Sequence, residues 1–319
     1  MGKNAASYKF ALAKCLLDYP VNKDSAIRLE DLSRPFSESL CSHLRLSDKQ
    51  GTSPSSTLLD SLRKYNQGEI SEEERIKVTT ELGFVNVIDA FHIVSRLETP
   101  IRFFVDERQS KNQIRLTDDF YRMRESIQYH NLIDEVEARW RLVETAWQMN
   151  ISSSLISVSH DIEQGTFFIE DPSLKRTDVT SARPALNGYQ KGKCFYCFSD
   201  ISINGDASDM ADVDHFLPHR LKAAGKMANI DGVWNLVLAC KRCNRGKDGK
   251  FDRAPEIRYL ERLNKRNNFL IESHHPLRET LMYQTGRTTR ERIAFLNECY
   301  RHAEVINPWR PVNELSAAF

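Results

Sequence analysis

The chain has 319 residues, of which 40% are hydrophobic and 28% charged, and this composition excludes a largely disordered protein. The 45 Lys and Arg against 44 Asp and Glu leave a net charge of +1, and no apolar run reaches the ~18 residues of a membrane span. The N-terminus also lacks the apolar stretch of a secretory signal, so we expect a cytoplasmic protein that does not contact a membrane.

The near-neutral total charge is the sum of two unlike parts. Residues 1–170 carry 21 Lys and Arg against 26 Asp and Glu, a net of −5, whereas residues 171–319 carry 24 against 18, a net of +6. Such a difference is typical of proteins that confine a nucleic-acid surface to one part of the chain. A difference of this size also arises by drift, so it needs support from motifs.

Residues 1–170 are predicted to form a mostly helical N-terminal domain. Apolar residues recur there at spacings of three and four, the period of a helix with one buried face. The predicted helices cover residues 8–17, 36–44, 71–82 and 118–149. Ser71, followed by three glutamates, opens the third of them as a capping box. Since this domain shows no recognisable catalytic set, we expect it to serve regulation or a protein partner such as an ATPase or helicase.

Two polar turns flanked by short apolar segments predict two hairpins. One pairs residues 101–106 with 113–117, and the other pairs 154–158 with 166–170. The next residues, 171–182, are polar and turn-rich, and we predict that they form an interdomain linker.

Residues 253–319 return to the helical period and are predicted to form a helical extension. Its helices are expected over residues 255–271, 276–284 and 289–305. Between the linker and this extension the chain alternates strand-like and turn-like segments. The whole pattern therefore predicts the α+β class, with a mostly helical first domain and a mixed second one.

Four of the seven cysteines form two C-x-x-C pairs. Cys194 and Cys197 make the first pair, and Cys240 and Cys243 make the second. An odd total in a chain without a secretory signal argues against a disulfide framework, whereas two such pairs are the ligand set of a tetrahedral Zn(Cys)4 site. We therefore expect a structural Zn²⁺ ion. The three other cysteines lie in apolar patterns and are predicted to be small buried side chains.

Two strand-like segments and several polar residues lie in and around the interval between these pairs. Asp214 and His215 end the first segment, and Asn235 lies in the second, residues 233–239. Asn244 and Lys247 follow directly after the second cysteine pair. In this order the residues resemble the HNH endonuclease family, whose motif is two strands and a helix around one divalent metal ion. They look most like the HNH domain of RNA-guided CRISPR effectors, and the cysteine pairs look like those of HNH restriction and homing enzymes.

The resemblance implies a role for each of these residues. Asp214 and Asn244 would hold Mg²⁺ (or Mn²⁺), since carboxylate and amide oxygens suit these ions. His215 would be the general base that activates water. Asn235 would brace the loop that bears His215, and Lys247 would steady the charge of the phosphate.

The resemblance covers about residues 183–252, and basic residues cluster at its C-terminal end. We expect this cluster to contact the DNA backbone, the sequence-independent part of nucleic-acid binding. Its members are Lys241, Arg242, Arg245, Lys250 and Arg253. His219 is expected to be structural or to face the substrate, and Asp209 and Asp212 are expected to be solvated turn residues.

We expect the substrate to be double-stranded DNA, cut to 5′-phosphate and 3′-hydroxyl ends as the resemblance implies. An HNH domain joined to a helical module resembles bacterial restriction or anti-phage enzymes, and this analogy suggests a role in defence. Two alternatives stay open: an RNA-cleaving HNH effector, and a catalytically dead, zinc-stabilised DNA-binding adaptor. A homodimer is compatible with the family, because HNH restriction enzymes often need two active sites for a double-strand break.

Overall fold

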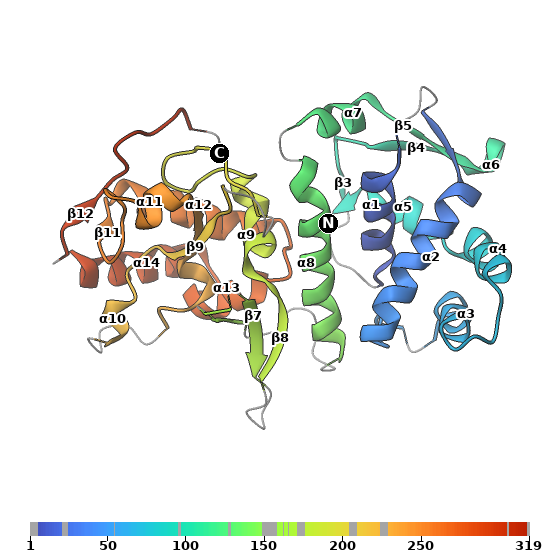
Figure 1. The fold of residues 1–319 in the computed structure, drawn as a ribbon, viewed down its shortest axis with the longest axis horizontal. Helices are drawn as coiled ribbons and strands as arrows, with labels where there is room; N and C mark the ends of the chain where they lie inside the picture. Colours follow the sequence, from blue (N-terminus) through green and yellow to red (C-terminus); the bar gives the residue numbers. More distant parts are fainter. Residues whose placement is uncertain are drawn as a thin grey trace. The chain divides into compact units, whose positions relative to one another are not determined.

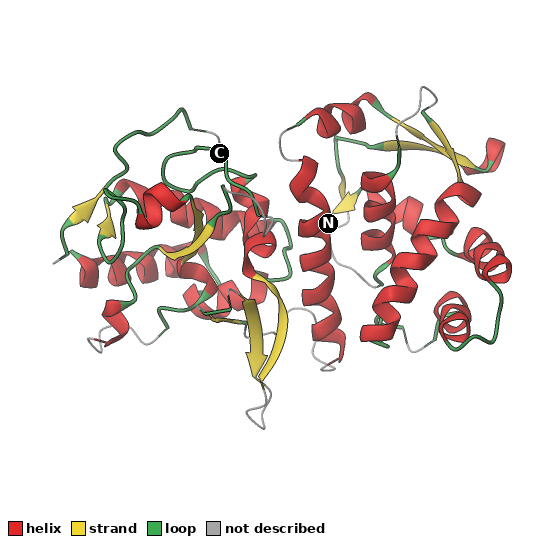
Figure 2. Cartoon of the chain, viewed as in Figure 1, coloured by secondary structure: helices red, strands yellow, loops and turns green. Residues whose placement is uncertain are grey.

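A computed structural model describes most of the chain. The described residues are 6–20, 25–53, 55–94, 97–126, 129–148, 158–161, 163–164, 166–170, 176–203, 209–223, 229–304 and 306–317. They form helices and small sheets, which agrees with the predicted α+β class (Figures 1 and 2). The contacts divide the chain into two compact units, residues 1–150 and 151–319. None of the helices in the described ranges is both long and apolar enough to cross a membrane.

The first unit is mostly helical, as predicted, and adds two small sheets (Figure 1). Its helices are α1 (Tyr8–Asp18), α2 (Leu29–Leu46), α3 (Thr57–Asn66), α4 (Glu72–Leu82), α5 (Val87–Phe91), α6 (Arg108–Lys111), α7 (Asp118–Glu125) and α8 (Tyr129–Gln148). In one sheet β5 (Gln113–Leu116) lies between β1 (Ala26–Arg28) and β4 (Phe104–Glu107), and in the other β2 (Ile93–Val94) pairs with β3 (Leu97–Glu98). The pairing of β4 with β5 confirms the first predicted hairpin.

Helix α1 lies at the centre of this unit's core and contacts both α2 and α8. Its side chains are apolar on most faces, so Phe10 and Leu12 are almost fully buried against residues such as Leu40 and Trp140. This burial explains the continuous apolar run in its sequence, because a helix surrounded by others has no solvent face.

Several elements of the first unit differ from the predictions or were not predicted, three of them helical. Helix α2 begins at Leu29 instead of residue 36, and Pro35 lies inside its second turn. The predicted helix 118–149 is two helices, because Ser126 is extended and ends α7. Helix α3 was not predicted, although Ser56 caps it by accepting a hydrogen bond from the Leu59 amide. A single apolar stripe runs through α7 and α8 since both pack on the same core, so periodicity does not reveal the break.

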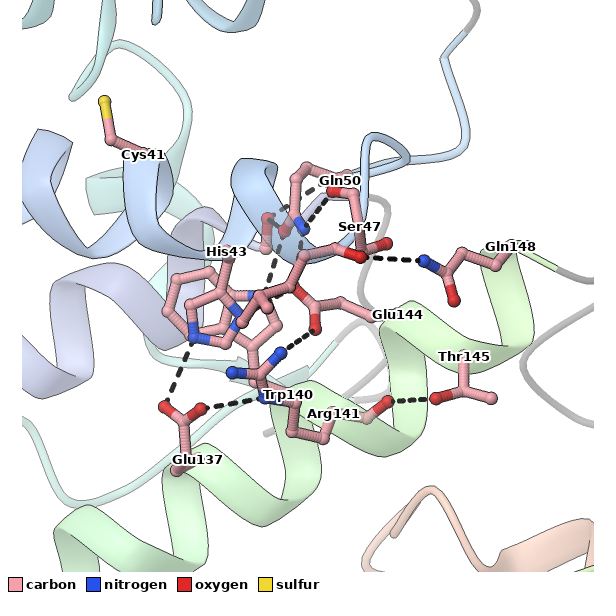
Figure 3. A network of polar contacts seen from close by, with 12 residues as sticks. Cys41, His43, Ser47, Gln50, Glu137, Trp140, Arg141, Glu144, Thr145 and Gln148 are labelled. Carbon is pink, nitrogen blue, oxygen red and sulfur yellow. Dashed lines mark hydrogen bonds and ion pairs between the residues drawn. The ribbon is translucent and has the colours of Figure 1, made fainter. Parts of the chain in front are cut away.

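A buried ionic network joins α2 to α8 in the first unit (Figure 3). His43 bonds Glu144 Oε1 through Nδ1 at 2.6 Å and Glu137 Oε2 through Nε2 at 3.2 Å, and its ring stacks on Trp140. Lys14 of α1 also bonds Glu137, at 2.8 Å. Burial lowers the pKa of His43, but the hydrogen bonds to the two glutamates outweigh burial and the net pKa is raised. Both ring nitrogens of His43 face carboxylates, an arrangement that favours its protonated form.

The second unit holds helices around three small sheets (Figure 2). Its helices are α9 (Ala182–Gln190), α10 (Arg220–Ala223), the 3₁₀ helix η1 (Val233–Asn235), α11 (Lys241–Arg245), α12 (Arg258–Glu272), α13 (Arg278–Thr285) and α14 (Thr289–Ala303). In the first sheet β9 (Asp212–His215) pairs antiparallel with β10 (Leu236–Ala239). In the second, β11 (Ala254–Pro255) pairs parallel with β12 (Pro308–Trp309). In the third, β7 (Thr166–Glu170) lies between β6 (Ser159–Asp161) and β8 (Arg176–Ser181).

Strands β9 and β10 followed by α11 form the predicted order of two strands and a helix, and the helical extension packs directly on them. Arg266 of α12, 1% exposed, donates hydrogen bonds to the carbonyls of Val233, Trp234 and Leu236. These bonds hold the entry to β10. Helices α12, α13 and α14 confirm the three helices predicted after residue 253, and they belong to the same compact unit as the strands.

The segment predicted as a linker, 171–182, contains a strand in its described part. Strand β8 occupies 176–181 and pairs with β7. Strands β6 and β7 form the second hairpin from residue 159 onward, and the predicted residues 154–157 lie outside the described ranges.

The observed division at residue 150 changes the charge of the two parts of the chain. The first unit carries 21 Lys and Arg against 23 Asp and Glu, a net of −2, and the second carries 24 against 21, a net of +3. The charge asymmetry is therefore much smaller than predicted.

Candidate active site

The two cysteine pairs come together in the second unit. The Sγ atoms of Cys194, Cys197, Cys240 and Cys243 all lie within 4.8 Å of one another. Cys240 caps α11, and its sulfur accepts a hydrogen bond from the Cys243 amide at 3.4 Å. Hydrogen bonding among the thiols, that of Cys194 first, lowers the pKa of Cys240 to about 6. Four clustered sulfur ligands are compatible with a structural zinc ion.

The segment that carries the first cysteine pair is fixed to the backbone of Leu238 in β10 by the Gln190 side chain and by the Phe195 amide. Gln190, the last residue of α9, donates to the Leu238 carbonyl at 2.7 Å and accepts from the Leu238 amide at 2.8 Å. The Phe195 amide donates to the same carbonyl at 2.9 Å. The loop with the first cysteine pair is thus attached to β10, which pairs with the strand that ends at His215.

Asp214 lies deeper in the unit than predicted. Its residue surface is 6% exposed, and both carboxylate oxygens have partners: Tyr196 Oη donates to Oδ2 at 2.6 Å, and Lys250 Nζ lies 3.2 Å from Oδ1. Lys250 is itself 1% exposed and also donates to the carbonyl of His215 at 2.9 Å. Burial raises the pKa of Asp214. This burial does not fit the predicted surface contact between Lys250 and DNA.

Asn244 contacts Asp212 in this structure. Its Nδ2 donates to Asp212 Oδ2 at 3.1 Å, and Arg245 Nε lies 3.0 Å from the same oxygen. Asp212 and Asp214 are two apart on β9, so their side chains share one face of the strand. Asp212 was expected to be a solvated turn residue, but it is a strand residue whose side chain is 12% exposed. Alternate residues of a strand share a face, so the position of Asp212 two residues before Asp214 is the signal that could have identified Asp212 from the sequence.

His215 is the last residue of β9, and its side-chain partners differ from those of Asp214. Its Nε2 donates to Asp231 Oδ1 at 3.0 Å, and His219 Nε2 lies 3.1 Å from the same oxygen. Lys222 donates to the other oxygen of Asp231. Burial is the main reason that the pKa of His215 is lowered to about 4, although Asp231 acts against it. The imidazole is therefore neutral near pH 7.

Asn235 occupies the bracing position that the resemblance implies. It is fully buried, and its side chain accepts from the Leu217 amide at 2.8 Å and donates to the Leu217 carbonyl at 3.0 Å. The same amide group donates to the Ile230 carbonyl at 2.9 Å. Asn235 therefore fixes the chain just after His215 and just before Asp231.

The predicted basic cluster is mostly at the surface. Lys241, Arg242, Arg245 and Lys247 are exposed on and beside α11, where they are accessible to a polyanion. Arg253 is half-buried and donates to the Asp248 and Gly249 carbonyls, so part of its guanidinium holds the loop after α11. Of the five members of the cluster, Lys241, Arg242 and Arg245 are therefore exposed.

Two residues next to His215 were not identified from the sequence. Asp231 lies 16 residues further on in a turn, where no periodic pattern indicates its contact with His215. His160 of β6 lies outside the segment that resembles HNH enzymes, yet its ring centroid is 6.2 Å from that of His215. The third sheet therefore contributes to the surroundings of the predicted base.

Comparison with known proteins adds no family to this geometry. No protein-family model matches the chain, and no curated protein or solved structure does either. The four-cysteine cluster, which could hold a zinc ion, is thus the part of the HNH resemblance that the structure supports.

Proposed function

We propose that the second unit is a metal-dependent endonuclease of the HNH type that hydrolyses phosphodiester bonds of double-stranded DNA. The observation that carries the proposal is the antiparallel pair β9–β10 leading into α11, with a neutral histidine at the end of β9 and the four-cysteine cluster beside it. Two strands and a short helix bearing these residues in this order are what the resemblance to the HNH family implies.

In the proposed reaction His215 is the general base. Its neutral imidazole accepts a proton from the attacking water, whose oxygen forms a bond to phosphorus while the bond to the 3′ oxygen breaks. The products are a 5′-phosphate and, once solvent protonates the leaving oxygen, a 3′-hydroxyl. Asn235 supports this step by holding the backbone on the C-terminal side of the base.

The oxygen ligands for Mg²⁺ or Mn²⁺ are best supplied by Asp212 and Asn244. The Asp212 carboxylate on β9 and the Asn244 amide in α11 lie 3.1 Å apart, and rotation of the amide presents its oxygen in place of its nitrogen. Both aspartates have bonded oxygens, but the partners of Asp212 include Arg245, which is exposed and can turn away. Asp214 fits less well, because its partners Tyr196 and Lys250 are buried. When bound, such an ion polarises the phosphate as a Lewis acid.

The exposed cations on and beside α11 would contact phosphates of the DNA backbone. Because phosphate contacts do not depend on the bases, this surface would bind a duplex of any sequence. By analogy with restriction and anti-phage enzymes, we propose a role in bacterial defence, with the first unit serving regulation or a protein partner such as an ATPase or helicase. Both proposed roles, in defence and in regulation, presuppose that the second unit is a nuclease.

Plasmid digestion in the presence of Mg²⁺ tests the nuclease proposal. We expect nicking or linearisation by the wild type, inhibition by a chelator, and no cleavage by His215→Ala; His302→Ala, in an exposed histidine of α14, is the matched control and should cleave normally. A single-stranded RNA offered in parallel distinguishes an RNA-cleaving effector. If duplex DNA is bound and never cut, the protein is a DNA-binding adaptor instead.

Two aspartate variants test the metal ligands. Asp212→Asn should raise the Mg²⁺ concentration needed for half-maximal cleavage by about 10-fold or more, since a carboxylate ligand is lost. Asp214→Asn should chiefly lower the stability of the second unit, because it removes the partner of buried Lys250. If Asp214→Asn instead raised the Mg²⁺ requirement and Asp212→Asn chiefly lowered stability, Asp214 would be the metal ligand.

A further inference from the structure

We propose that Asp231 is a positioning residue that holds His215 as the Nε2–H tautomer, so that Nδ1 is the nitrogen that accepts the proton. This inference rests on the proposed nuclease function for its catalytic meaning, and on contacts within the second unit for its geometry. It adds to the HNH-type motif a residue from the turn before η1, which the sequence resemblance did not include.

The tautomer follows from the chemistry of the contact. His215 Nε2 and Asp231 Oδ1 are 3.0 Å apart, and their side chains are 11% and 22% exposed. An ionised carboxylate can only accept hydrogen bonds, and a neutral imidazole carries one N–H. The proton must therefore lie on Nε2, which leaves the lone pair on Nδ1.

Asp231 is kept ionised by the groups that face it. Burial raises its pKa, but the hydrogen bond from Lys222 and the nearby imidazoles of His215 and His219 outweigh burial, and the net pKa is lowered. His219 and Lys222 each contact one carboxylate oxygen. His160, from β6, also lies near the His215 ring, with the two ring centroids 6.2 Å apart. The carboxylate is therefore held on more than one side and does not depend on His215 alone.

The turn that carries Asp231 is fixed by its own backbone contacts. The Asn235 amide donates to the Gly232 carbonyl at 2.9 Å, and Trp234 Nε1 donates to the Asn229 carbonyl at 2.9 Å. Gly232 also forms a β-bridge with Ser159 of β6. A side chain at Gly232 would begin 2.6 Å from the Trp234 ring, so this position requires glycine.

One side chain positions both members of the pair. The Asn235 carboxamide bonds Leu217, two residues after His215, and Ile230, one residue before Asp231. A base and its orienting carboxylate attached to the same rigid amide keep their relative position, which is what a fixed tautomer needs. An ion pair serving stability alone would not need this shared support.

The test compares Asp231→Asn with the wild type in two measurements. In cleavage assays with Mg²⁺ and duplex DNA, we expect kcat to fall about 100-fold or more, with KM changed less than about threefold, because substrate contacts are kept while the base loses its orientation. Asp252→Asn, at an exposed aspartate of the same unit, is the control and should behave like the wild type.

The second measurement is the ¹⁵N NMR spectrum of histidine-labelled protein, which reports tautomers without any cleavage. The wild type should show His215 protonated at Nε2, and Asp231→Asn should show a loss of that preference. If Asp231→Asn cleaves as fast as the wild type, the inference is wrong and the nuclease stands. If the wild type cuts no nucleic acid, the nuclease proposal fails, and the NMR result alone decides the role of Asp231.

Zinc content and circular dichroism show whether Asp231→Asn is folded. Should it not be, Asp231→Glu takes its place, since it keeps the carboxylate and moves it by one methylene. We then expect a smaller loss of kcat with the Nε2–H tautomer partly retained. Unchanged kcat together with an unchanged tautomer in Asp231→Glu would count against a geometric role.

Discussion

Each unit contains a histidine bonded to a carboxylate, but the pKa values of the two histidines are shifted in opposite directions. In the first unit His43 lies between Glu137 and Glu144, and its pKa is raised. In the second unit His215 shares one carboxylate with another histidine and a lysine, and burial lowers its pKa to about 4. The balance of charge around a buried imidazole thus decides whether it is a structural cation or a neutral base.

The comparison also separates two uses of a carboxylate. Glu144, with a side chain 3% exposed, neutralises the charge of His43 and stabilises the packing of α2 on α8. Asp231, 22% exposed, is already neutralised by Lys222 and can orient His215 without making it a cation. The following predictions change one partner at a time, beginning with the largest expected effect.

Removing the zinc ligands should unfold the second unit and leave the first intact. Structural zinc contributes on the order of 10 kcal/mol to the folding of small domains, so Cys240→Ser or prolonged chelation should abolish the melting transition of the second unit. Cys299→Ala, at a buried cysteine of α14 away from the cluster, is the control and should lower the transition only modestly. Calorimetry of the full chain measures both transitions, and an unchanged second transition after zinc removal would contradict this prediction.

His43→Leu should destabilise the first unit by about 3 kcal/mol, because buried Glu144 loses its nearest cationic partner and keeps only Arg141, at 3.5 Å. The second unit and its cleavage activity should not change. Urea denaturation followed through both transitions measures the effect, with His302→Ala as the control. Adding Glu144→Gln to His43→Leu should recover part of the loss. Equal destabilisation of both units would show that the network is not confined to the first.

The stability of the first unit should depend on pH in a way that His43→Leu removes. Because the folded pKa of His43 is raised, its contribution is complete below the unfolded value of about 6.5 and is lost as pH rises through the folded pKa. Burial opposes ionisation of Glu137, but hydrogen bonds from His43 and Lys14 lower its pKa, so its contribution is lost as pH falls below about 4.3. The expected change is on the order of 1 kcal/mol per pKa unit. Chemical denaturation between pH 4 and 9 measures it, and a flat profile would contradict the charged state of His43.

The smallest expected effect concerns DNA binding by the second unit. Lys241→Gln should lower the slope of log affinity against log salt by about 1, because one phosphate contact is lost. Lys265→Gln, at an exposed lysine of α12, is the control. Binding of a short duplex at several salt concentrations gives the slope. An equal slope for both variants would place the DNA elsewhere on the molecule.

The sequence predicts most elements of the fold because most follow from local patterns. The hairpin at β4–β5, the N-cap at Ser71 and the three C-terminal helices depend on periodicity and turn residues that lie close together in the chain. The break between α7 and α8 and the strand at 176–181 were missed, since they depend on tertiary packing that no short window contains.

The candidate site was predicted where spacing constrains chemistry. Four cysteines in two C-x-x-C pairs predict a metal site, and the structure brings their sulfur atoms together. The partners of the predicted catalytic residues come from distant segments, for example Lys250 beside Asp214 and Asp231 beside His215. Which residues become these partners depends on which distant segments pack against β9. Residue spacing along the sequence does not determine that packing.

Cleavage of supercoiled plasmid by purified full-length protein, with and without Mg²⁺, tests the central claim most directly. The proposed mechanism predicts Mg²⁺-dependent nicking or linearisation by the wild type and a loss of at least about 100-fold in His215→Ala, with zinc content and melting of both units retained. Equal cleavage by His215→Ala and the wild type, or no cleavage of any nucleic acid by the wild type, would contradict it.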